Sequence, residues 1–310
     1  MGVFVFLPLV LPLTAWPIAR LAEFRLHPRT ATRLLTWTAV LLAVCSTLCL
    51  ALLMVVGTAQ LPGNPLPDGW SDPEVRKAVP YDEVAGRVAI PALLAVTVSC
   101  LAAGWRHVRV RRQAARAVAG LAGRSVAVLP DQAAYAYALP AWRGGGQVVV
   151  SSGMLAGLTP GERRALFAHE RAHLAHRHHR FLLGVQLAAR ANPFLRPLRT
   201  AVAFTAERWA DEEAAARTGS RRTVALAVGK SALVSRGAPV ASLAHFAAGP
   251  VPRRVAALLG PAPVARNWFS VFTTLGLAMW TAAAGVTVSA LSSANSAVTL
   301  FFILHAALDA

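Results

Sequence analysis

The sequence predicts a multi-pass α-helical membrane protein that carries an α+β domain between its third and fourth spans. Hydrophobic residues make up 55% of the 310 residues and charged residues only 15%, and the mean hydropathy is +0.50. Four windows are mainly apolar over about 20 residues, the length that crosses a bilayer. Residues 106–266, between the third and fourth windows, mix short strand-like and helical patterns, as a small α+β domain does.

The four apolar windows are interpreted as membrane spans. We expect them at about residues 1–19, 34–57, 88–105 and 268–291. Proline residues in the first window are tolerated in a membrane helix, and the window lacks the basic start of a secretory signal, so we expect it to be retained. The apolar segment 297–308 is short, and both a fifth crossing and a helix lying in the interface fit it.

Arginine clusters set the predicted orientation. The chain has 31 Lys and Arg against 14 Asp and Glu, a formal charge of +17, and arginines directly follow the first and third windows. Because Lys and Arg mark the cytoplasmic ends of spans, we expect the N-terminus outside. The predicted domains are 1–105, with three spans and an extracellular loop at 58–87, the cytoplasmic domain 106–266, and 267–310, with the fourth span and a short apolar C-terminal segment.

The same charge balance bears on partners. A nucleic-acid-binding protein with this much positive charge is normally polar overall. We therefore expect the lipid bilayer as a partner and do not expect nucleic acid.

Local patterns predict the elements of the cytoplasmic region. Residues Arg124–Leu129 and Gln147–Ser151 have the composition of strands. The segment Thr159–Glu162 has the form of a capping box with proline in the first turn, so we expect a helix from there through at least His178. A second helix is expected over about 198–218, ended by a glycine.

A metal-binding pattern lies on the first of these helices. Residues His169, Glu170 and His173 form the pattern His-Glu-x-x-His. Residues four apart lie on one face of a helix, so both imidazoles can reach one tetrahedral Zn²⁺ while Glu170 faces the metal-bound water. The pattern predicts one zinc ion, with Glu170 as the general base.

The third protein ligand must come from elsewhere in the chain. Glu207 is the preferred candidate, because Asp211 follows one turn later and can orient a ligating imidazole. Glu212 and Glu213 lack such a partner, and a solvated acidic helix face is the alternative reading of this cluster. His179 is rejected because a continuous helix carries it too far along the axis. The remaining histidines of the segment are expected on the solvated face: His176, His178 and His179.

Hydrolysis also needs a group that stabilises the oxyanion. Arg254, His245 and Tyr137 are the candidates. An alternative of a different class is a membrane signalling protein with a non-catalytic zinc site. Such a site normally closes its fourth position with Cys or His, and the three cysteines all lie in apolar windows, which counts against it.

The segments His169–Arg180, Asn192–Pro193 and Glu207–Asp211 resemble the membrane zinc peptidases of the BlaR/MecR type and their relatives, the HtpX-type and CAAX prenyl proteases. The resemblance spans roughly residues 124–260. It implies a gluzincin-type α+β metallopeptidase domain in a bacterial cell membrane. It also implies that His169, His173 and Glu207 bind zinc, that Glu170 is the base and that Asp211 belongs to the downstream motif.

The resemblance further implies that the strand Val148, Val149, Val150 and Ser151 lies along the substrate. It suggests a zinc metalloendopeptidase that cleaves a protein or peptide substrate at the cytoplasmic face, in regulatory proteolysis of a transcriptional-repressor-like protein. HtpX-like quality control of membrane proteins is the alternative. Two residues depart from the pattern, Arg171 and His178, the latter where many relatives have Asp. We expect no penicillin-binding sensor domain.

Overall fold

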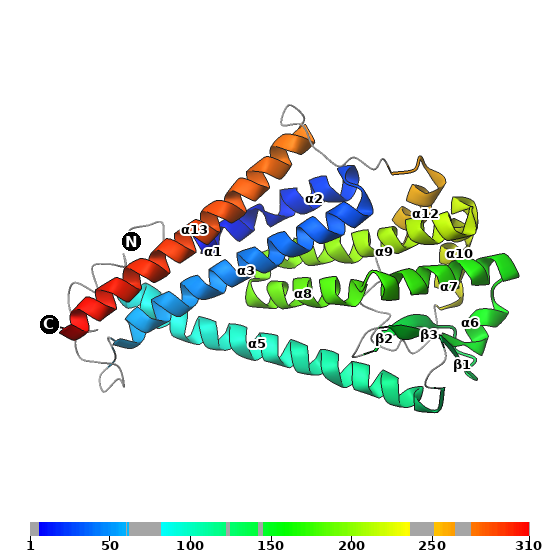
Figure 1. Cartoon of the computed structure of the whole chain (residues 1–310), viewed down its shortest axis with the longest axis horizontal. Coiled ribbons are helices and arrows are strands. Elements are labelled where there is room, and N and C mark those ends of the chain that lie inside the picture. Colours follow the sequence, from blue (N-terminus) through cyan, green and yellow to red (C-terminus); the bar gives the residue numbers. More distant parts are fainter. Residues whose placement is uncertain are drawn as a thin grey trace.

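The computed structural model describes residues 6–59, 61, 82–121, 125–141, 145–235, 251–263 and 274–309. It is mostly helical, with one three-stranded sheet (Figure 1). Three long helices converge at one end of the molecule, and the sheet lies at the other, with the short helices that follow it in the sequence close by. The long helices are α3 (Pro28–Ala59), α5 (Asp82–Ala117) and α13 (Thr274–Asp309).

These three helices are long and apolar enough to cross a membrane, over Pro28–Ala59, Val84–Ala117 and Trp280–Ala306. The windows expected at 34–57 and 88–105 lie inside α3 and α5. They identify the chain as a membrane protein.

The C-terminal region differs from expectation. The predicted fourth span and the short segment 297–308 belong to one continuous helix, α13, so the separate fifth crossing or interfacial helix is wrong. The polar residues between them do not interrupt the helix, because Ser293 and Ser296 are buried. The Ser293 hydroxyl donates to the carbonyl of Cys45 on α3 at 3.5 Å. Residues 268–273 of the predicted span lie outside the described part of the chain.

The first apolar window is a series of short helices. Its described residues form α1 (Leu7–Val10), η2 (Leu11–Thr14) and α2 (Ala15–Arg25). Prolines stand near the starts of these pieces, where the missing N–H costs least. None of the pieces is one of the helices long enough to span, so a crossing at 1–19 stays a prediction.

Helices α3 and α5 meet at one end and diverge toward the other. Gly57 and Gly86 lie so close that a Cβ on either would overlap the backbone of the other. Further along, α8 (His178–Ala191) lies between the two helices (Figure 1). There Gly184 packs against Thr36 and Val40 of α3. Helix α9 (Arg196–Thr218) also joins α3, through a hydroxyl contact of 3.0 Å between Thr32 and Thr205.

The sheet comprises β1 (Val126–Leu129), β2 (Ala136–Pro140) and β3 (Gly146–Ser151), in the order β1-β3-β2. Strand β1 is parallel to β3, and β2 is antiparallel to β3. The expected strands coincide with β1 and β3, whereas β2 was not among the expected elements. The remaining helices near the sheet are α6 (Ser152–Ala156), α7 (Pro160–Ala175), α10 (Arg221–Val234) and α12 (Val251–Leu259).

Helix α7 begins as predicted but ends early. Thr159 and Glu162 form the capping box, with the Thr159 amide donating to the Glu162 carboxylate at 2.7 Å. The helix was expected to continue through His178, but it ends at Ala175, and Arg177 takes a left-handed conformation with φ of 54°. This turn starts α8 in a new direction, in which α8 packs on both α3 and α5.

The close contact between Gly57 and Gly86 makes a stability prediction. We expect Gly57→Ala to lower the free energy of unfolding by about 1–3 kcal/mol, because the added methyl group overpacks the crossing of α3 and α5. Gly104→Ala is the matched control, since an added Cβ at Gly104 in α5 meets no atom within 4 Å. Thermal unfolding in detergent measures both. Equal melting temperatures for the two variants would contradict the close crossing.

Candidate metal centre

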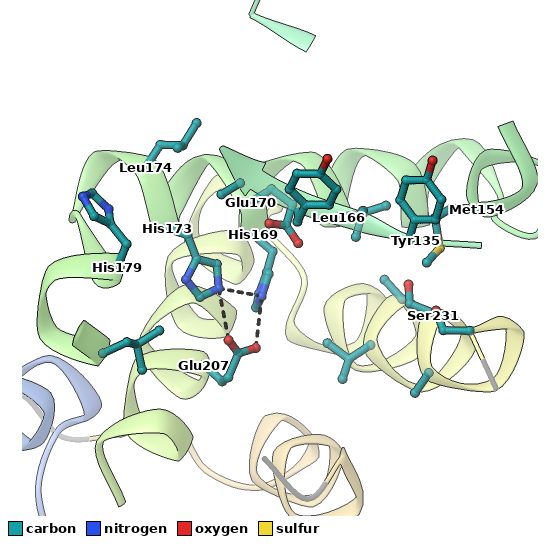
Figure 2. Close-up of a pocket in the computed structure, with 18 of the residues that line it drawn as sticks. Tyr135, Met154, Leu166, His169, Glu170, His173, Leu174, His179, Glu207 and Ser231 are labelled. Atoms are coloured by element: carbon teal, nitrogen blue, oxygen red, sulfur yellow. Dashed lines mark hydrogen bonds and ion pairs between the residues drawn. The ribbon is translucent and has the colours of Figure 1, made fainter. Parts of the chain in front are cut away.

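Three side chains from two helices converge at the centre of the domain (Figure 2). His169 and His173 lie one turn apart on α7, and Glu207 faces them from α9. The two Nε2 atoms are 3.1 Å apart. They lie 3.4 Å and 3.3 Å from the two carboxylate oxygens of Glu207, respectively. The structure therefore brings together the three predicted ligands.

This donor set fits a zinc ion. A tetrahedral zinc with bonds of about 2.0–2.1 Å separates its ligand atoms by about 3.3–3.4 Å, close to the distances observed here. The Oε1 atom of Glu207 is buried and has no hydrogen-bond donor among the described residues, as expected of an atom that faces a cation. Two imidazoles and one carboxylate leave a fourth position, which is the composition of a catalytic zinc site.

Asp211 and Arg254 lie behind the ligands. The Oδ1 atom of Asp211 lies 3.0 Å from Nδ1 of His169, where a carboxylate that orients this imidazole is expected. Arg254, on α12, donates from Nε and Nη2 to Asp211 at 2.9 Å and 2.7 Å, and its Nη1 lies 2.8 Å from Oε2 of Glu207. One guanidinium group thus bridges both carboxylates.

The charge of Arg254 keeps these carboxylates ionised. Burial would raise the pKa of Glu207, but Arg254, His173 and His169 lower it to about 2. Burial would likewise raise the pKa of Asp211, and Arg254 holds it well below its usual range. Glu207 is therefore negatively charged at neutral pH, as a metal ligand must be.

The second nitrogen of His173 contacts another histidine. Its Nδ1 lies 2.9 Å from Nδ1 of His178, which is fully buried at the start of α8 and packs on Trp209. Burial and the neighbouring histidines lower the pKa of His178, so its ring is neutral. With Nε2 of His173 bound to a metal, the Nδ1–H of His173 would donate to Nδ1 of His178. The expectation that His178 is solvated is wrong, because the turn at Arg177 brings it under His173.

His176 and His179 are placed differently. His176 is partly exposed, stacks on Trp209 and lies 3.5 Å from Glu213. His179 lines the cavity beside the metal ligands, to one side of them in Figure 2. Neither belongs to the metal-binding group found among the described residues.

Glu170 is buried next to the ligands. Its carboxyl group lies beside His169 (Figure 2), in the cavity that Ala138 of β2 also lines. Burial raises the pKa of Glu170 to about 7, which suits a group that accepts and returns a proton near neutral pH.

The structure changes the interpretation of the oxyanion candidates. Arg254 is engaged with two carboxylates and is no longer available as a donor for an oxyanion. The ring of Tyr137 packs in an apolar cluster with Val118, Ala127 and Val149, and burial raises its pKa. His245 lies outside the described residues.

The expected substrate strand also needs correction. Strand β3 is central in the sheet and pairs with β1 and β2, so the backbone of Val148, Val149, Val150 and Ser151 has no open side. Strand β2 is an edge strand, and it borders a cavity of about 580 Å³ that contains the metal site. Two signals in the sequence pointed to β2, namely its alternating pattern and its position just before a glycine turn.

The alternative acidic ligands are paired elsewhere. Glu212 contacts Arg208 and Arg221, and Glu213 contacts His176 and Arg217. These ion pairs explain the presence of Glu212 and Glu213 near Glu207 without requiring that either residue bind the metal.

The contact between His173 and His178 makes the first prediction for this site. We expect His178→Ala to weaken zinc binding by about 10–100-fold, because it leaves the Nδ1–H of His173 without an acceptor. His178→Asp restores an acceptor and should bind zinc more tightly than the Ala variant. His179→Ala is the control. Competition with a chromophoric chelator measures the affinities, and equal values for all four proteins would contradict the role of His178.

The bridge formed by Arg254 leads to the second prediction for this site. Arg254→Met should lower the free energy of unfolding by about 3–5 kcal/mol, since it leaves two buried carboxylates without their cation. Arg222→Met, at an exposed position of α10, is the control and should change stability little. Thermal unfolding of the zinc-free proteins isolates this effect from metal binding. A similar melting temperature for both variants would show that the bridge is not needed.

Comparison with known proteins adds one finding. Residues 101–191 match the model of Peptidase family M48, a stretch that holds His169, Glu170 and His173 and ends before Glu207. No curated protein and no solved structure matches the chain. The match and the donor set together support a metallopeptidase related to family M48.

Proposed function

We propose that the chain is a zinc-dependent membrane endopeptidase that cleaves polypeptides at the cytoplasmic face. One observation carries the proposal: a donor set of His169, His173 and Glu207 lies next to the buried Glu170, in a cavity bordered by an edge strand. A structural zinc site normally closes its fourth position with a fourth protein ligand. An open position beside a buried carboxylic acid instead suits hydrolysis.

His169, His173 and Glu207 would hold a zinc ion, which would supply a Lewis acid for the scissile carbonyl and the attacking water. Glu170 would take a proton from the attacking water and deliver it to the leaving amine. Asp211 and His178 keep the Nδ1 atoms of the two imidazoles engaged, so that both Nε2 lone pairs face Glu207. Arg254 keeps Glu207 and Asp211 ionised and in place.

The biological role is the finer part of the proposal. The resemblance to BlaR/MecR-type peptidases favours regulatory proteolysis of a repressor-like protein. Quality control of membrane proteins, as in the HtpX-type relatives, is the second candidate. Both roles use the same residues, so the test of the chemistry below applies to either.

Two substitutions separate metal binding from catalysis. Glu170→Gln should keep a full equivalent of zinc and lose at least about 99% of the activity, because it removes the general base. Glu207→Ala should lose zinc and activity together. Glu213→Ala, on the same helix but paired at the surface, is the matched control and should retain both.

Elemental analysis of the detergent-purified proteins measures zinc, and digestion of casein measures activity. Full activity of Glu170→Gln would refute the mechanism. Equal zinc in wild type and Glu207→Ala would remove Glu207 as a ligand.

A further inference from the structure

The open edge of β2 faces the candidate catalytic residue. The carbonyl of Tyr135 accepts a hydrogen bond from the amide of Ser151 in β3 at 3.0 Å. Backbone groups alternate along an antiparallel strand, so those of Ala136 and Ala138 point to the opposite side. Ala136 and Ala138 line the cavity that also holds Glu170, and the amide of Ala138 helps to lower the pKa of that carboxyl group. No described strand pairs with this side of β2, so the amide and carbonyl of Ala136 and the carbonyl of Ala138 are open to an extended peptide.

One end of this edge is tied to a membrane helix. Nη2 of Arg111, on α5, donates to the carbonyl of Pro140, the last residue of β2, at 3.0 Å. The apolar part of α5 ends near Trp105. Its exposed indole, like that of Trp37 on α3, has the position of an interfacial aromatic residue. Arg111 lies less than two turns further along, or about 9 Å. The Pro140 end of β2 is therefore the end nearer the membrane.

The cavity is oriented in the same way, with one end near the membrane and the other away from it. Side chains from the spanning helix α5 and from α8 line the end nearer the membrane: His107, Arg111, His179, Leu182, Leu183 and Gln186. Side chains from α6 and α10 line the far end: Met154, Val228, Ser231 and Ala232. Figure 2 shows His179 on one side of the metal ligands, and Tyr135, Met154 and Ser231 on the other.

Helix α8 continues from the cavity into the space between the spanning helices. The carbonyl of Leu187 lies 3.7 Å from Sγ of Cys100, in the apolar part of α5. The wall of the cavity at this end is thus continuous with the membrane-spanning part of the molecule.

We propose that the cavity takes a membrane-anchored polypeptide whose anchor precedes the cleaved bond. The proposal rests on the peptidase function proposed above. A peptide added to β2 in the antiparallel sense, the more stable and more frequent pairing, runs opposite to β2. Its N-terminal part then lies at Pro140, beside α5, and its C-terminal part extends toward Tyr135, away from the bilayer.

This direction decides which substrates reach the site and what is released. A chain that emerges from a preceding span reaches the Pro140 end directly. A chain anchored by a following span must leave at the far end and turn back to the bilayer. Hydrolysis adds OH to the acyl carbon and a proton to the leaving amine, so the anchored part keeps a new carboxylate. The C-terminal part, with a new amino group, is released from the membrane.

Two substrates that differ only in the order of their parts test the proposal. Each substrate consists of one span and the same casein segment, joined by a linker of about 10 residues. The casein segment is one that the wild type cleaves in solution. A second pair of substrates has flexible linkers of about 60 residues. In one order the span precedes the casein segment, and in the other it follows. The full chain and each substrate are placed together in liposomes, and rates are normalised to the substrate exposed on the peptidase side.

With the short linker, we expect the form with the preceding span to be cleaved at least about tenfold faster, because its linker can span the required distance. The long linkers should abolish the difference. Equal rates with short linkers, or a preference for the following span, would overturn the proposal while leaving the peptidase function intact. If Glu170→Gln cleaves the soluble casein segment as fast as the wild type does, the peptidase function itself fails, and this proposal fails with it.

Discussion

A single guanidinium group holds the candidate site together. Arg254 comes from α12, the two carboxylates that it bridges come from α9, and one of them orients an imidazole of α7. One buried cation therefore connects three helices. Its planar fork makes a two-point contact with Asp211 that the point charge of a lysine cannot reproduce. Because buried charges are stable only in pairs, the contact of the same guanidinium group with Glu207 also keeps that carboxylate ionised.

Local spacing explains which site residues were predictable. His169 and His173 are four apart on one helix, and so are Glu207 and Asp211 on another, and the helical repeat alone puts each pair on one face. Arg254 and His178 follow no such rule. Arg254 joins the site through tertiary packing 43 residues beyond Asp211. His178 joins it because Arg177 adopts a left-handed conformation without the glycine that usually signals one.

The membrane helices and the sheet show the same limit. Hydropathy measures how apolar a segment is and does not report whether its helix is continuous, so the break in the first window and the unbroken run of α13 were both missed. The serines of α13 suggested an interruption because the sequence does not show that they are buried, as Ser293 is in its contact with Cys45 of α3. Strand order also depends on tertiary packing. The family resemblance therefore assigned the substrate to β3, the strand ahead of the helix, although β3 is central and β2 is the edge strand that borders the cavity.

Zinc K-edge X-ray absorption on the purified protein tests whether these residues bind zinc, because it reports the ligand atoms themselves. We expect a four-coordinate zinc with two imidazole nitrogens and oxygen ligands at about 2.0–2.2 Å. We also expect the imidazole signal to fall by half when His173 is replaced by Ala. A spectrum with sulfur at about 2.3 Å, or one unchanged by that substitution, would show that the metal binds elsewhere.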